Sequence, residues 1–144
     1  MAKSLYKAVK KRAWGWFSKY IRARDCLETT RGISRGRCVT CGIEYDFKEL
    51  QAGHCIGGRN DSILFDEELV NIQCNKCNRP ISMGGKGGNY TQYSIWFVKR
   101  YGLEKLEEKV FQSHQVLKFT IPDLEEISDK YRNMYNGLVK LILK

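Results

Sequence analysis

The chain has 144 residues and a formal net charge of +9, and 42% of its residues are hydrophobic and 12% aromatic. This composition excludes a disordered tail, and the length fits one compact domain or a small domain with helical arms. No apolar run is long enough to cross a membrane and no signal-peptide core follows the basic N-terminus, so we expect a protein that works in a reducing cytoplasm.

The N-terminal segment, residues 1–36, is predicted to be a basic helix followed by an Arg-rich loop. We expect the helix over residues 5–24, where apolar residues recur every three or four positions. Residues 1–102 carry 18 Lys and Arg against 9 Asp and Glu, whereas residues 103–144 carry 7 against 7. The excess positive charge therefore lies in the first two-thirds of the chain, and its natural partner is a polyanion. Charge alone leaves open a basic surface that serves only solubility.

The middle segment, residues 37–101, has a different composition. Most of it is rich in Cys, Gly and Asn and poor in long periodic runs, which indicates a small metal-organised core of short strands, turns and one short helix. Residues 47–52 are predicted to form one of these strands. A flexible loop is expected over residues 82–88, and it lacks the Gly-Lys-Ser/Thr ending of a phosphate-binding loop. Residues 90–101 are predicted to form a helix that leads into a glycine stop signal.

The C-terminal segment, residues 102–144, is predicted to be helical. One helix is expected over residues 103–114. The last helix begins near Pro122, because a proline and several acidic residues occupy its first turn. Its apolar residues form a narrow stripe at a spacing of three or four residues. This stripe either packs on the core or forms the seam of a homodimer.

Two Cys-x-x-Cys pairs lie within the middle segment. Each pair presents two thiolates from one tight turn, and two such turns together form a tetrahedral sulfur site suited to zinc. A redox Cys-x-x-Cys motif is the alternative, but that motif usually occurs singly. A closed site of four cysteines holds a structural zinc ion rather than a catalytic one. The predicted zinc ligands are Cys38, Cys41, Cys74 and Cys77.

One of the two histidines, His54, lies between the cysteine pairs. It follows the predicted strand and precedes a Gly-Gly-Arg-Asn turn, so we expect it near the surface of the zinc-held segment. Imidazole can take a proton from water near neutral pH, which is what a general base for phosphodiester hydrolysis requires. A lone histidine is more often a structural residue, and His114 is interpreted in that way.

An ordered set of motifs runs across residues 10–102. These motifs are Phe17-Ser18-x-Tyr20-Ile21-Arg22-x-Arg24-Asp25, Cys38-x-x-Cys41, Gln51-Ala52-Gly53-His54, Phe65-Asp66-Glu67-Glu68, Asn71-Ile72-Gln73-Cys74-x-x-Cys77-Asn78-Arg79, Gly88-Asn89-x-x-x-Tyr93 and Tyr101-Gly102. The set resembles the phage NinG (Rap) recombination nuclease family. The spacing of the cysteine pairs is also similar to that of the phage recombination endonuclease VII family, which belongs to the same zinc-stapled His-Asn-His superfamily.

The resemblance implies an α+β fold: a small ββα-metal core stapled by the zinc site and flanked by N- and C-terminal helices. It also implies a metal-dependent DNA endonuclease that cuts branched recombination intermediates such as Holliday junctions or D-loops. His54 would be the general base, Asn78 would bind a catalytic Mg²⁺ or Mn²⁺ ion, and Asn71 would support the loop that carries the base. Such an enzyme would act in the cytoplasm of the bacterial host.

The chain departs from the superfamily pattern beside the base. The residue before the histidine is often an Asp that binds the metal, but here it is Gly53. The middle Asn of many members lies where this chain has Leu69, and the loop before Gly88 is expanded. The second ligand of the catalytic metal therefore stays open. Its candidates are Asp61, Asp66, Glu67 and Asn89.

Basic residues of the first helix and the following loop are expected to bind backbone phosphates, which suits an enzyme selective for DNA structure rather than sequence. Three other functions remain: a non-catalytic zinc module that binds DNA, a sequence-specific His-Asn-His endonuclease, and an interaction adaptor that binds no DNA. The predicted DNA contacts are Lys10, Lys11, Arg12, Arg22, Arg24, Arg31, Arg35, Arg37 and Arg59.

Overall fold

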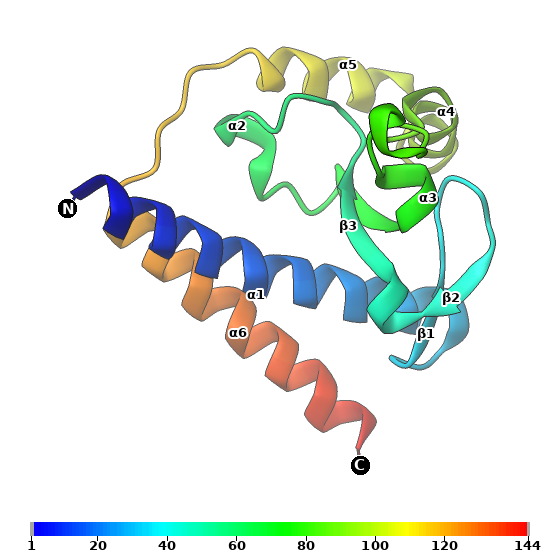
Figure 1. Cartoon of the computed structure of the whole chain (residues 1–144), viewed down its shortest axis with the longest axis horizontal. Helices are drawn as coiled ribbons and strands as arrows, with labels where there is room; N and C mark the ends of the chain where they lie inside the picture. The colour runs from blue at the N-terminus through cyan, green and yellow to red at the C-terminus, as the bar shows by residue number, and fades with distance from the viewer. Residues whose placement is uncertain (1, 144) are drawn as a thin grey trace.

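The computed structural model describes residues 2–143, in which long helices surround two small antiparallel sheets (Figure 1). The predicted combination of helices with small sheets is thus confirmed. No helix within these residues has the length and hydropathy needed to cross a membrane. In chain order the elements are α1 (Ala2–Thr30), β1 (Arg35–Arg37), β2 (Glu44–Asp46), η1 (Phe47–Glu49), β3 (Leu50–His54), α2 (Asp61–Leu64), β4 (Val70–Cys74), α3 (Asn75–Asn78), η2 (Ile81–Met83), α4 (Tyr90–Tyr101), α5 (Leu103–Ser113) and α6 (Ile121–Ile142).

Helix α1 is longer at both ends than the predicted residues 5–24. Its last turns are held by tertiary contacts that periodicity does not reveal. The buried carboxylate of Asp25 accepts a hydrogen bond from the backbone N–H of Ile72 at 2.9 Å, and Cys26 packs into the same region. The hydroxyls of Thr29 and Thr30 bond back to carbonyls of the preceding turn and satisfy acceptors near the helix end. The helix therefore continues until its C-terminal turn is anchored on β4.

Strands β3 and β4 pair antiparallel, with Gly53 opposite Asn71 and His54 opposite Val70. The strand predicted at residues 47–52 begins three residues later and ends at His54, because residues 47–49 form a 3₁₀ turn. Because the strand extends to His54, the alternation of side chains places His54 and the Gly53 position on opposite faces of the sheet. Figure 1 shows β3 lying between α1 on one side and α4 on the other.

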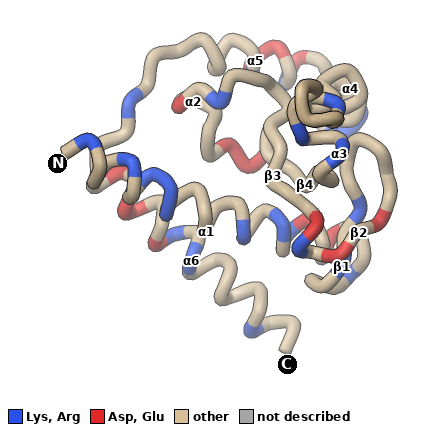
Figure 2. Tube along the Cα trace, viewed as in Figure 1, with Lys and Arg blue, Asp and Glu red and all other residues tan. Residues whose placement is uncertain are grey.

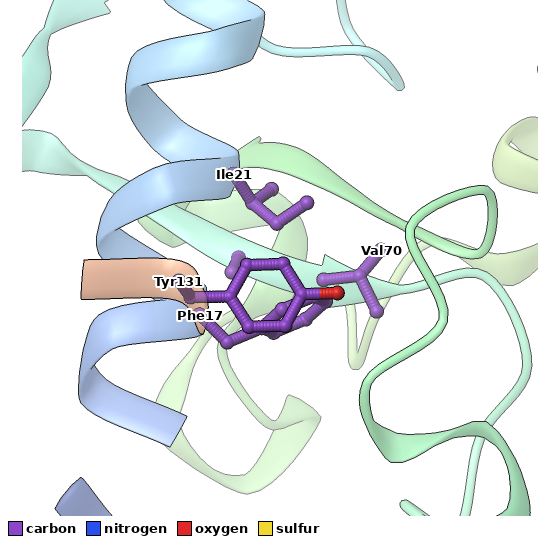
Figure 3. Close-up of a cluster of buried hydrophobic side chains, with 5 residues drawn as sticks. Phe17, Ile21, Val70 and Tyr131 are labelled. Carbon is purple, nitrogen blue, oxygen red and sulfur yellow. The ribbon is translucent and has the colours of Figure 1, made fainter. Parts of the chain in front are cut away.

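The face of β3 and β4 that contacts α1 carries one hydrophobic cluster. Phe17 and Ile21 of α1 pack there against Val70 and against Tyr131 of α6 (Figure 3). The rings of Phe17 and Tyr131 meet edge to face, with centroids 4.8 Å apart. On the opposite side, a second cluster joins Tyr93 and other residues of α4 to the loop between β3 and β4. Both clusters border the same two-stranded sheet.

Helix α6 begins as its sequence predicts and packs beside α1. Thr120 and Asp123 form a capping box in which each side chain accepts a hydrogen bond from the backbone N–H of the other residue. Leu124 is buried near the start of α1, and Tyr131 is buried farther along it, so the two helices run in the same direction (Figure 1). The last turn of α6 leaves Leu141 exposed.

Candidate functional site

Four cysteine sulfurs converge between the turn after β1 and the start of α3. The Sγ atoms of Cys38, Cys41, Cys74 and Cys77 all lie within 4.8 Å of one another, and those of Cys41 and Cys74 are 3.9 Å apart. A tetrahedral zinc ion with Zn–S bonds of about 2.3 Å requires sulfur atoms roughly 3.8 Å apart. The four side chains therefore fit the predicted structural zinc ion.

The electrostatics of this cluster also favour a bound cation. Burial raises the pKa of the Cys38 thiol, but hydrogen bonds from Thr40 and from backbone N–H groups outweigh it and bring the pKa to about 7. Burial and the neighbouring thiolates raise the pKa of Cys41 and of Cys74. Four thiolates this close repel one another, so a cation is needed to hold all of them deprotonated.

His54 lies at the end of β3, where its ring stacks on Trp14 of α1 with centroids 5.3 Å apart. Its Nε2 is 3.2 Å from the carbonyl oxygen of Leu64. A carbonyl oxygen only accepts, so Nε2 carries the proton and donates it. The remaining ring nitrogen, Nδ1, then carries the lone pair. The backbone of the β3–β4 loop thus selects one tautomer and orients the ring.

The expectation that His54 lies near the surface is wrong. The residue is only 8% exposed, because Trp14 covers one face of the ring. Burial lowers the pKa of His54 to about 4, with a smaller lowering contribution from the positive charge of Arg59. The imidazole is therefore neutral at pH 7 and keeps its lone pair.

An open groove lies between α1 and β3; His54 does not line it, but Trp14, on which the His54 ring stacks, does. Trp14 and Asn78 line it, and so do the cationic side chains of Arg22, Lys48 and Arg59. The guanidinium of Arg59 lies over the Trp14 ring, 4.5 Å from its centroid. The groove therefore places positive charge on an aromatic surface, directly above the ring that covers His54.

Asn78 lies at the end of the short helix α3, on the opposite side of β3 from the imidazole. Its Nδ2 donates to Oε1 of Gln51 at 2.7 Å. A Cβ atom built on Gly53 would come within 3.0 Å of its Oδ1 atom. The amide oxygen of Asn78 therefore faces the residue that precedes His54.

Asn71 is buried and fully hydrogen-bonded in the middle of β4. Its Oδ1 accepts from Arg24, while its Nδ2 donates to the carbonyl of Glu68 and to Tyr93. The Tyr93 hydroxyl in turn donates to the carbonyl of Gly53 at 2.7 Å. Asn71 thus holds the backbone next to His54 through Tyr93, and it has no free group to offer a ligand.

A family model described as "Bacteriophage Lambda NinG protein" matches residues 2–140, nearly the whole chain. The chain belongs to the NinG family. No curated protein and no solved structure matches it significantly. The family match extends through α5 and α6, beyond the residues 10–102 that carry the sequence motifs.

The three carboxylates among the predicted candidates for a second metal ligand in this NinG chain are paired with other residues, whereas Asn89 uses only its Nδ2. Asp61 pairs with Lys10 at 2.7 Å, and Asp66 receives hydrogen bonds from two backbone N–H groups and from Lys109. Glu67 accepts from Tyr131, and Asn89 donates to the sulfur of Cys77. Within residues 2–143, the four cysteines are the only cluster of three or more Cys, His, Asp or Glu ligand atoms.

The predicted DNA contacts fall into four groups. The guanidinium of Arg24 points inward to Asp25, Asn71 and the carbonyls of Glu67 and Val70, so it is already engaged within the fold. Three others are tied in ion pairs with acidic side chains: Lys10, Arg35 and Arg37. Arg22 and Arg59 line the groove, and Lys11, Arg12 and Arg31 are exposed.

Sequence reasoning missed the roles of three residues that surround His54 and Asn78. Trp14 packs against the hydrophobic cluster of Phe17 and is also the ring on which His54 stacks. Tyr93 belongs to a family motif, and its hydroxyl donates to the Gly53 carbonyl. Gln73 lies in the family motif directly before Cys74, but its diagonal position across the sheet from Gly53 became visible only in the strand register.

Proposed function

We propose that this NinG-family protein is a metal-dependent DNA endonuclease of the His-Asn-His type that acts on branched DNA in the cytoplasm of a phage-infected cell. The observation that carries the proposal is the arrangement around Gly53. A neutral, tautomer-selected imidazole follows this residue in β3, and the amide oxygen of Asn78 approaches the same residue from α3. A DNA-binding module without catalytic activity has no use for this combination.

In this mechanism, Nδ1 of His54 accepts a proton from the water that attacks the scissile phosphate. The hydrogen bond from Nε2 to the Leu64 carbonyl keeps the ring in the base-competent tautomer. The Asn78 amide oxygen fits a hard divalent cation, which prefers oxygen ligands. Bound Mg²⁺ or Mn²⁺ would supply positive charge to the phosphate and the leaving 3′ oxygen. Asn71 and Tyr93 position the His54 backbone without touching the substrate.

The groove between α1 and β3 provides the substrate surface. Arg22, Lys48 and Arg59 would contact phosphates on either side of the scissile bond. Phosphate contacts carry no sequence information, which suits recognition by DNA shape. Two points support a preference for Holliday junctions or D-loops: the chain belongs to the NinG family, and its motifs resemble those of phage recombination nucleases. A homodimer would supply the two active sites needed for symmetric junction cutting.

The test compares cleavage of a labelled four-way junction and of a matched linear duplex, in Mg²⁺ and in Mn²⁺. We expect the wild type to cut the junction faster, and we expect His54→Ala to lose about 10²- to 10⁴-fold in rate while binding DNA normally. His114→Ala is the matched control, because His114 lies after α5. It should cut as the wild type does.

The outcomes separate the proposed function from its rivals. Binding without cutting in either metal would favour a zinc module that only binds DNA. Cutting of one linear sequence in preference to junctions would favour a sequence-specific endonuclease. Absence of DNA affinity at low salt would leave an interaction adaptor. Equal activity of His54→Ala and the wild type would remove His54 from the chemistry.

A further inference from the structure

Two side-chain amide oxygens face the same small space beside Gly53. A Cβ atom built on Gly53 would lie 1.9 Å from Oε1 of Gln73 and 3.0 Å from Oδ1 of Asn78. Gln73 belongs to β4 and is 0% exposed, whereas Asn78 ends α3 and borders the open groove. Both oxygens therefore lie within 3.0 Å of one point, the Cβ position of residue 53, and Asn78 connects that point to the groove.

The orientation of the Gln73 amide is determined by its nitrogen. Nε2 donates to the carbonyl oxygen of Gly88 at 2.8 Å and to the hydroxyl of Thr40 at 3.2 Å. A flipped amide would place an oxygen against the Gly88 carbonyl, so Oε1 must point toward Gly53. This oxygen is buried and accepts no hydrogen bond from any described residue.

The orientation of the Asn78 amide follows from a chain of three amides. Gln51 uses its Nε2 to donate to Asn75 at 3.2 Å, which leaves its Oε1 to accept from Nδ2 of Asn78 at 2.7 Å. The oxygen of Asn78 is thereby turned toward Gly53. Two acceptor oxygens thus face one space, and a buried acceptor without a donor is unfavourable. A cation between the two oxygens would relieve this cost.

Gly53 makes this arrangement sterically feasible. The register pairs Gly53 with Asn71 and Gln51 with Gln73, so Gln73 is the diagonal neighbour of Gly53 on the same face of the sheet. Any side chain at position 53 would collide with the Gln73 carboxamide. The Asp that often precedes the histidine in the superfamily pattern has no room here, because Oε1 of Gln73 lies 1.9 Å from the position of its Cβ.

We propose that Gln73 is the second protein ligand of the divalent cation, with Oε1 of Gln73 and Oδ1 of Asn78 holding it from β4 and α3. The inference rests on the proposed function, because it assigns the missing ligand of that site. Both ligands are neutral, so they attract a cation less strongly than a site containing a carboxylate. Water and the DNA phosphate must supply the remaining oxygens, as is usual for Mg²⁺. The cation should therefore bind weakly to the free protein and more tightly when DNA is present.

The test measures binding of Mn²⁺ to the zinc-loaded protein, using the electron paramagnetic resonance signal of free Mn²⁺ at equilibrium. Gln73→Glu keeps an oxygen in place and adds a negative charge, so it should tighten Mn²⁺ binding at least tenfold. Gln73→Met keeps the length of the side chain but has no oxygen, so it should weaken binding at least tenfold. Gln115→Glu introduces the same charge at an exposed position after α5 and should leave Mn²⁺ affinity unchanged.

A double variant keeps the proposal testable if the single Gln73 variants misfold. Gly53→Asp combined with Gln73→Ala moves the ligand from β4 back to β3 and removes the collision between the two positions. It should bind Mn²⁺ at least as tightly as the wild type, whereas Gln73→Ala alone should not. In addition, Mn²⁺ should raise the Tm of Gln73→Glu more than that of the wild type, because the cation neutralises a buried carboxylate.

Failure of this inference differs from failure of the proposed function. If Gln73→Glu and Gln73→Met both bind Mn²⁺ as the wild type does, while His54→Ala still abolishes cleavage, Gln73 is only structural and the nuclease stands. If the Gln73 variants shift Mn²⁺ affinity as expected but the wild type cuts no DNA, the metal site stands without the nuclease. If the Gly53→Asp, Gln73→Ala variant binds Mn²⁺ more weakly than the wild type, Gln73 on β4 does not substitute for an Asp at position 53 on β3.

Discussion

At the scale of single residues, burial makes His54 sensitive to acid. Its pKa is near 6.5 in an unfolded chain and about 4 in the fold, because burial disfavours the charged ring. The folded state therefore binds fewer protons than the unfolded state between these pH values. The stability that the neutral ring contributes is fully present above pH 6.5 and is lost as the pH falls toward 4.

We therefore expect the wild type to lose about 2 kcal/mol more unfolding free energy than His54→Gln between pH 7 and pH 5. Urea unfolding of the zinc-loaded proteins at both pH values measures the difference. The comparison cancels any effect of acid on the zinc site, which both proteins share. Equal losses would mean that His54 is protonated in the fold at pH 5.

Arg24 and Arg12 belong to the same basic helix but should behave differently on substitution. Arg24 is hydrogen-bonded to the buried carboxylate of Asp25, to Asn71 and to two carbonyls. Arg24→Ala leaves these groups unpaired and should lower the unfolding free energy by about 3 kcal/mol. Arg12→Ala removes an exposed side chain and should change it by about 0.5 kcal/mol at most. Chemical unfolding compares the two, and a stable Arg24→Ala protein would contradict the internal role.

At the scale of elements, the four-cysteine cluster, which fits a zinc ion, connects segments that have few other means of staying in place. β1 is three residues long and α3 is four, so neither is stable by itself. The cluster of Cys38, Cys74 and Cys77 joins the turn after β1 to the end of β4 and to α3. Asn78 ends α3, so the position of this amide depends on the zinc site.

We expect wild-type protein to contain one zinc ion per chain and Cys77→Ser to contain much less, with loss of the cooperative thermal transition. Metal analysis by atomic emission together with calorimetry measures both effects. Cys55→Ser is the control, since Cys55 is buried in the cluster beside α4 and away from the four sulfurs. Loss of zinc from Cys55→Ser, or its retention in Cys77→Ser, would argue against the four-cysteine site.

At the scale of the whole molecule, the net charge of +9 does not form one uniform face. Figure 2 shows basic residues on α1, α3 and α4, with acidic residues interspersed on α5, α6 and around β2. Several cations of the first segment are neutralised by ion pairs, such as Lys10 with Asp61 and Arg35 with Glu44. The groove between α1 and β3 retains the cationic side chains of Arg22, Lys48 and Arg59.

DNA affinity should therefore fall steeply with added salt, and the groove cations should account for part of the slope. Arg59→Ala and Lys48→Ala should each reduce the slope of log K against log salt concentration by about 1. Lys118→Ala, in the exposed linker before α6, should leave the slope unchanged. Fluorescence anisotropy across a salt series measures it. Wild-type slopes in the groove variants would place the DNA on another face.

Much of the fold could be predicted because its signals are local. The capping box at Thr120 and the glycine at position 102 mark helix ends that depend on neighbouring residues only. The two cysteine pairs predict a shared metal because each pair is complete within four residues. The start of β3 could not be predicted in the same way, because the 3₁₀ turn over residues 47–49 has no strong sequence signal.

The sequence by itself determined where the long helices lie along the chain, the pairing of the four cysteines and the family, since these depend on spacing along the chain. Only the tertiary structure decided which way the side chains face. Alternation along β3 turns His54 toward α1 and the Gly53 position toward Gln73 and Asn78. The burial of His54 beneath Trp14 and the inward turn of Arg24 likewise depend on residues 40 or more positions away. Such contacts arise from packing between distant segments, which no local pattern encodes.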